Sequence, residues 1–130
     1  MSRSLARENV FKLVFEYVFN KEKNEDYFED VLNDESNKAE VGYISEVYNG
    51  IITHYDELLE DIKKSSESFK LDRIFKVDLA ILLVALYEMK YIKSIPQMVS
   101  INEALNLAKV YSTEKSNKFI NGILSNFIGE

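Results

Sequence analysis

The residues best suited to binding chemistry are basic and aromatic, and they form two small groups near opposite ends of the chain. The groups are Arg3, Arg7 and Phe15, and Lys115, Lys118 and Phe119. Guanidinium and ammonium groups bind phosphate, and aromatic rings stack on unpaired bases, so this combination suits single-stranded RNA. The alternative is that the cations are ordinary surface charges and the rings belong to the core. Residue periodicity by itself favours that alternative.

Each group needs a helix to bring its members together. Arg3 and Arg7 are four residues apart and can share one helical face. Lys115 and Lys118 stand at the start of the last predicted helix, where free backbone N–H groups and the positive end of the helix dipole also favour phosphate. These positions predict an RNA site built from the first and last helices.

Residues for catalysis are scarce. The chain has no cysteine and one histidine, His54, so a Cys/His or Ser/His/Asp nucleophile system is impossible or depends on a single residue. Neighbouring carboxylates such as Asp56 and Glu57 point about 100° apart on a helix and do not converge on a metal. The sequence contains no P-loop, H-E-x-x-H, EF-hand or G-x-G-x-x-G motif. We therefore expect a protein that is not an enzyme and that binds no metal or cofactor.

Charge is unevenly distributed along the chain. The formal net charge is −6, but residues 24–62 contain twelve acidic residues and one basic residue, a balance of −11. Subtracting −11 from −6 leaves +5 on the other 91 residues, which allows a basic face outside the acidic segment. Because phosphate neutralisation supplies most non-specific affinity, this modest charge predicts weak RNA binding by the protein alone.

Apolar residues recur every three or four positions along most of the chain, a spacing typical of helices. One proline and four glycines are too few turn residues for a β-rich fold. We expect an all-α protein of six or seven helices in a single domain, residues 1–130. The predicted helices lie near residues 4–20, 26–32, 41–52, 58–62, 72 or 78 to 91, 101–111 and 113–128, with a loop at 33–38.

Three local features refine this assignment. The stretch Leu79–Tyr87 is apolar on all sides, so its helix should be central. Ser100 and Glu103 have the spacing of a capping box at the start of the next helix, and Ser112 or Thr113 is expected to cap the last one.

No segment of the sequence resembles a targeting signal or a membrane span. The first ten residues carry charges before any apolar run develops, unlike a signal peptide. The stretch Leu79–Tyr87 is roughly half as long as a bilayer-spanning helix. We expect a cytoplasmic protein without a membrane partner.

Four ordered blocks of sequence resemble the NusB family, and together they cover nearly the whole chain. They are Arg3 with Ala6-Arg7-Glu8; Val77 to Leu82 with Ala85-Leu86-Tyr87-Glu88; Ile95-Pro96, Val99, Ile101-Asn102-Glu103-Ala104 and Leu107-Ala108-Lys109; and Ser116 with Lys118 to Leu124. Four blocks in the same order at compatible spacing are far more specific than any one of them.

The resemblance implies two small helical bundles packed across each other and a role in transcription antitermination. A protein of this family would bind the boxA element of ribosomal-RNA leader transcripts jointly with a small-subunit ribosomal protein that doubles as a transcription factor. The complex then helps RNA polymerase read through terminators. Such a factor works by binding, without turnover.

The resemblance also implies roles for particular residues. The RNA face would use Arg3, Arg7, Phe15, Lys115, Lys118 and Phe119. Asp72, Asp78 and Glu88 fall where the family places acidic residues facing the basic protein partner. For Asp78 and Glu88 the alternatives are helix capping and internal pairing, which are equally compatible with the sequence.

Two departures from the family pattern bear on RNA affinity. The dense arginine cluster common at the family's N-terminus is reduced here to Arg3 and Arg7, whereas Lys115 is basic where relatives can have an acidic residue. A helical protein-interaction module with little or no intrinsic RNA binding is therefore the alternative function. A third candidate function is that of an accessory domain of a ribosomal-RNA methyltransferase. The sequence also allows a homodimer.

Overall fold

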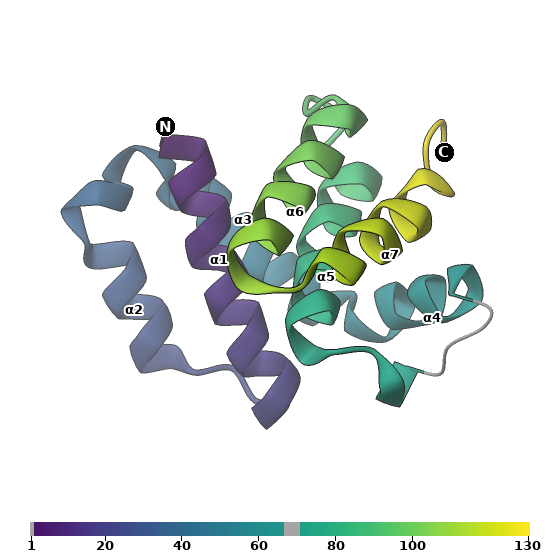
Figure 1. The fold of residues 1–130 in the computed structure, drawn as a ribbon. Coiled ribbons are helices and arrows are strands. Elements are labelled where there is room, and N and C mark those ends of the chain that lie inside the picture. Colours follow the sequence, from purple (N-terminus) through teal and green to yellow (C-terminus); the bar gives the residue numbers. More distant parts are fainter. Residues whose placement is uncertain (1, 67–70) are drawn as a thin grey trace.

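The computed structural model describes residues 2–66 and 71–130, which form α-helices and short 3-10 helices without any strand (Figure 1). In chain order they are α1 (Ser2–Asn20), α2 (Glu25–Asn33), η1 (Glu35–Glu40), α3 (Val41–Thr53), α4 (Tyr55–Ser65), η2 (Leu71–Arg73), α5 (Lys76–Tyr91), α6 (Gln97–Tyr111) and α7 (Glu114–Ser125). The described residues therefore confirm the all-α prediction, with seven α-helices. None of these helices is both long and apolar enough to cross a membrane.

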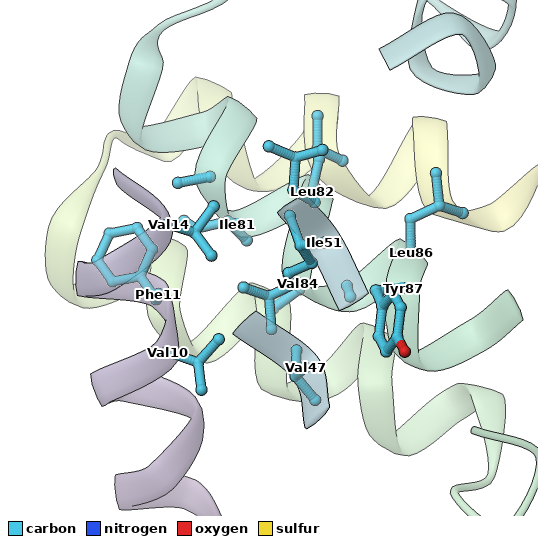
Figure 2. Packing of buried hydrophobic residues seen from close by; sticks show 14 of the residues in the cluster. Val10, Phe11, Val14, Val47, Ile51, Ile81, Leu82, Val84, Leu86 and Tyr87 are labelled. Atoms are coloured by element: carbon cyan, nitrogen blue, oxygen red, sulfur yellow. The ribbon is translucent and has the colours of Figure 1, made fainter. Parts of the chain in front are cut away.

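Helix α5 lies at the centre and contacts α1, α3, α4, α6 and α7. Helices α1–α3 form one bundle and α4–α7 the other, and the two meet where α1 packs along α5 (Figure 1). Figure 2 shows side chains of α1, α3 and α5 meeting in the shared core, among them Val14, Ile51 and Ile81. Ile51 and Ile81 are completely buried, and burying a side chain of this size stabilises the fold by about 1.5–3 kcal/mol.

The structure corrects two predicted helix boundaries. Helix α6 begins at Gln97, directly after Pro96, and not at Ile101. Ser100 therefore lies inside the helix and caps nothing; its hydroxyl donates a 2.7 Å hydrogen bond to Glu88 of α5. The predicted loop at 33–38 contains most of η1, whose first turn is capped by the carboxylate of Asp34.

Of the two residues predicted to cap the last helix, Ser112 and Thr113, the cap is Thr113. Thr113 precedes α7, and its hydroxyl oxygen accepts a 3.2 Å hydrogen bond from the backbone N–H of Ser116. This bond satisfies one of the donors that a helix start leaves free and fixes where α7 begins.

Gly50 allows α3 to lie directly against α5. A Cβ added to Gly50 would fall well inside van der Waals distance of the Tyr87 hydroxyl and ring. We expect Gly50→Ala to lower the free energy of unfolding by about 1–3 kcal/mol, because overpacking outweighs the gain in helix propensity. Urea unfolding would measure this change.

Gly42 of the same helix provides the matched control. An added Cβ there meets nothing within 4 Å. Gly42→Ala should be neutral or stabilising by up to about 1 kcal/mol. Equal stability of the two alanine variants would contradict the close packing of Gly50 on Tyr87.

A polar cluster joins α4 to the end of α5. The Nζ of Lys90 lies 2.6 Å from a carboxylate oxygen of Glu57 and 2.5 Å from one of Asp61. The Tyr91 hydroxyl donates a 2.5 Å hydrogen bond to Glu57, and its ring stacks on His54. The hydrogen bonds from Lys90 and Tyr91 lower the pKa of Glu57 from 4.5 to about 2.

This lowered pKa predicts a pH-dependent contribution to stability. Because the carboxyl group is more acidic in the folded chain, its contribution is present above pH 4.5 and is lost as the pH falls towards about 2. We expect Glu57→Gln to be less stable than the parent at pH 6, by a small amount because Glu57 is half-exposed. Unfolding measured between pH 6 and pH 2 should show this difference shrinking below pH 4.5.

Asp56→Asn is the control for the pH series, since Asp56 stands beside Glu57 in the first turn of α4 and shares its helix dipole. A stability difference for Glu57→Gln that stays constant with pH, or that Asp56→Asn reproduces, would count against the cluster.

Candidate nucleic-acid interface

A groove of about 900 Å³ lies between η2, the start of α5 and the start of α7. Its lining includes three cations, Arg73, Lys115 and Lys118, and two aromatic rings, Phe75 and Phe119. Glu114 contributes one carboxylate to the same wall. The groove thus combines groups for phosphate with groups for base stacking.

A buried carboxylate holds the two sides of the groove together. Asp78, in the first turn of α5, is 4% exposed and accepts hydrogen bonds from the hydroxyls of Ser112 (2.6 Å) and Ser116 (2.8 Å). These bonds tie the start of α5 to the start of α7. The structure therefore corrects the prediction that Asp78 faces a protein partner, in favour of internal pairing.

The groove cations are available to a ligand. Arg73, Lys115 and Lys118 are exposed, and within residues 2–66 and 71–130 none of the three makes a salt bridge. Lys115 and Lys118 extend from the first turns of α7, where the helix dipole adds positive potential. Both lysines therefore lie at the start of the last helix, as the sequence predicted.

The two predicted aromatic residues lie in neighbouring positions with different surroundings. Phe119 is partly buried against the core and presents its remaining surface to the groove. Phe15 is also partly buried, but it lines a second, adjoining groove together with Phe19 and Phe75. Each ring is thus partly in the core and partly accessible from a groove.

Arg7 occupies a different position from the one predicted. It is 4% exposed, and its guanidinium donates to both carboxylate oxygens of Glu88, at 2.8 and 3.2 Å. The surface contact with RNA predicted for Arg7 is therefore corrected to a buried ion pair between α1 and α5. The physical reason is that a fully buried carboxylate needs a cation beside it.

Glu88 is completely buried and serves as the centre of this pairing. Besides Arg7, it accepts hydrogen bonds from Ser100 and from the hydroxyl of Tyr43. Burial and the negative charge of Glu88 raise the pKa of Tyr43, which keeps its hydroxyl protonated and able to donate. Like Asp78, Glu88 is buried and paired inside the protein, which corrects the prediction that it faces a protein partner.

Arg3 and Asp72 remain at the surface. Arg3 pairs with Glu40 at 3.0 Å and lies over the ring of Tyr43, 4.4 Å from its centroid. It stands twelve residues before Phe15, about 18 Å along α1, so the predicted RNA contacts of α1 do not meet at one point. Asp72 is exposed on η2, next to Arg73 of the groove.

Sequence reasoning missed Arg73, Phe75 and Lys76. Phe75 is 60% exposed, an unusual position for a large aromatic ring. The available signal was a phenylalanine placed between two basic residues, Arg73 and Lys76, just before the most apolar helix. Because the helix was predicted to start at either Asp72 or Asp78, the sequence did not settle whether Phe75 lies inside it.

Fold and groove together define a class: all-helical proteins in which exposed cations and aromatic rings meet at the ends of two helices. Residues 4–129 match the model of the NusB family. The chain is 43% identical over 130 residues to the transcription antitermination protein NusB of Agathobacter rectalis, covering 98% of this chain and 99% of that protein. The chain belongs to the NusB family.

Solved structures agree with this assignment. The structure of T. maritima NusB is 34% identical and superposes with a TM-score of 0.83, covering 98% of this chain and 91% of that one. A chain from a crystal structure of antitermination factors NusB and NusE in complex with dsRNA is 25% identical, with a TM-score of 0.85 and coverage of 97% and 95%. The family and the helical fold therefore rest on sequence and structure alike.

Proposed function

We propose that this chain is a transcription antitermination factor that binds boxA-type single-stranded RNA of ribosomal-RNA leader transcripts together with a small-subunit ribosomal protein. Its membership of the NusB family supports this role, since a 43% identical relative is named a transcription antitermination protein. Another relative was crystallised with NusE and dsRNA, which supports joint binding of a protein and an RNA. The complex would act on RNA polymerase in the cytoplasm, where transcription takes place.

The groove between η2 and α7 is the observation that carries the RNA-binding part of this proposal. Lys115 and Lys118 would neutralise phosphates, and Phe119 would stack on an unpaired base. Arg3, at the other end of α1, would contact a more distant phosphate after exchanging its pairing with Glu40. Phe15 would contribute through the adjoining groove.

Asp72 is the acidic residue that we propose for the contact with the basic ribosomal protein. It is exposed on η2, next to the groove residue Arg73. A partner bound there would lie beside the RNA, and complementary charges would set its register. This arrangement accounts for joint binding of the two ligands.

We also propose that the protein acts by binding alone, as a single domain over residues 1–130. The residue with the best potential for general acid–base catalysis, His54, stacks on Tyr91 and lies 3.3 Å from Glu57 at the junction of α3 and α4. These contacts give it a structural role. Glu57, the carboxylate beside His54, is itself held by Lys90 and Tyr91, which commits it to the α4–α5 cluster.

A titration of a boxA-type single-stranded RNA would test the proposal. Binding by the chain alone is expected to be weak and to fall steeply with salt, and the ribosomal protein should strengthen it. A scrambled RNA of equal length is the control for sequence preference. Absence of RNA binding both with and without the ribosomal protein would refute the proposal.

One observation favours the alternative of a protein-interaction module with little intrinsic RNA binding. Both N-terminal arginines are paired with carboxylates of the chain itself, Arg7 with buried Glu88 and Arg3 with Glu40 at the surface. This alternative predicts tight association with a basic protein that RNA leaves unchanged.

A further inference from the structure

A second groove, of about 370 Å³, adjoins the first on the side of α1. The two share Phe75 and Thr113 in their linings, so one continues into the other. The second groove is bordered by Phe15 and Phe19 of α1 and by Lys76 at the start of α5. A ligand that follows the first groove past Phe75 therefore enters the second.

The second groove contains an unusual concentration of accessible aromatic surface. Phe19 is 57% exposed and Phe75 is 60% exposed. Phe15 supports this surface from below, because its ring meets that of Phe19 edge to face at 5.0 Å between centroids. A single exposed ring needs no explanation, but rings gathered around one hollow mark a binding site.

Charge indicates what kind of ligand fits. Lys76 is exposed, and among the residues that the structure describes none that lines the second groove carries a carboxylate. The adjoining groove supplies Arg73, Lys115 and Lys118. Cations that follow a path with rings along it match the backbone and bases of a single nucleic-acid strand, whereas a basic protein would be repelled.

We propose that Phe19 and Phe75 form a base-stacking subsite, with Lys76 as its phosphate contact, that extends the path of single-stranded RNA beyond the first groove. The subsite rests on the proposed function, because it binds the continuation of the same strand. One unpaired base would stack on or between the two exposed rings. Lys76 would pair with a neighbouring phosphate.

Fluorescence of 2-aminopurine placed at successive positions of the RNA tests the subsite in the complex of full chain, ribosomal protein and RNA. One position outside the segment that contacts Phe119 should be quenched by stacking in the parent complex. Phe75→Ala and Phe19→Ala should restore its fluorescence. Each should also weaken RNA binding roughly 5- to 150-fold, the range contributed by one stacked base.

Two further variants sharpen the test. Lys76→Gln should reduce the slope of log affinity against log salt by about 0.7, the value for one phosphate on a single strand. Met98→Ala removes an exposed apolar side chain of α6 that lines neither groove, and it should change nothing. Thermal unfolding of each variant controls for folding. Because Phe19 and Phe75 are exposed, we expect their alanine variants to fold like the parent.

The outcomes separate the subsite from the proposed function. If the parent complex binds RNA and Lys118→Ala weakens it, but Phe19→Ala and Phe75→Ala do not, the subsite is refuted and the function stands. If the parent complex does not bind RNA, the function itself fails. If the two phenylalanine variants weaken binding of the ribosomal protein in the absence of RNA, the groove is a protein-docking surface and the subsite is overturned.

Discussion

Replacing Glu88 with alanine is expected to lower the free energy of unfolding by about 3–5 kcal/mol. The substitution removes the carboxylate that accepts two hydrogen bonds from buried Arg7, and it removes the acceptor of Tyr43 and Ser100. Glu103, 3.8 Å from Arg7 and partly exposed, is a weaker counter-charge. A buried donor that loses its partner costs the full desolvation of that group. Chemical denaturation with and without the substitution would measure the change, which is the largest that we expect from a single polar residue.

A double-substitution cycle separates the ion pair from loss of packing. Arg7→Met should cost about as much as Glu88→Ala, whereas Arg7→Met combined with Glu88→Leu should recover most of the loss, because no charge is then left buried. Lys90→Met, which removes the partly exposed cation of the α4–α5 cluster, is the control and should cost less. Loss of less than about 1 kcal/mol in Glu88→Ala would contradict the buried network.

Reversing the charges of the groove lysines is expected to weaken RNA binding about tenfold or more at low salt. The variant Lys115→Glu/Lys118→Glu replaces two phosphate contacts with two repulsive charges at the start of α7. The salt dependence should become shallower as well, because fewer counterions are released. Filter binding or fluorescence anisotropy in the presence of the ribosomal protein would measure both effects.

Lys63→Glu/Lys64→Glu is the matched control for this variant. These lysines are adjacent and exposed in the last turn of α4, and their reversal changes the net charge equally. It should leave RNA affinity close to that of the parent apart from a small general effect. Equal losses in the two double variants would show that net charge, and not the groove, determines the affinity.

The helical elements were predictable because each carries its own local pattern. The apolar stretch within α5 predicted a central helix, and Thr113 predicted the start of α7. Ser100 was misread because its spacing to Glu103 satisfies a local rule, while its hydroxyl is required by Glu88 twelve residues away. Pro96, the N-cap residue of α6, was the better marker of where this helix begins, since proline is common at helix starts.

The candidate site was only partly predictable, because burial depends on contacts between distant segments. Lys115 and Lys118 are close in sequence, so their shared surface could be inferred from helix geometry alone. Arg7 and Glu88 are 81 residues apart, and nothing in either segment shows that they neutralise each other. The sequence therefore identified the charged residues without showing which of them face solvent.

The buried pairing also explains how a sparse arginine arm fits the proposed function. One arginine of the arm, Arg7, holds α1 against α5, and Arg3 alone remains at the surface. Intrinsic RNA affinity must then come mainly from the α7 groove, with few cations. Binding should consequently depend strongly on the ribosomal protein.

The most direct test of this account is the coupling between RNA and the ribosomal protein. The affinity of the chain for each ligand should be measured with and without the other, for example by calorimetry. We expect each ligand to strengthen the other by the same factor, because coupling between two equilibria is reciprocal. Tight binding of the ribosomal protein that RNA does not change would contradict joint binding and identify a protein-interaction module instead.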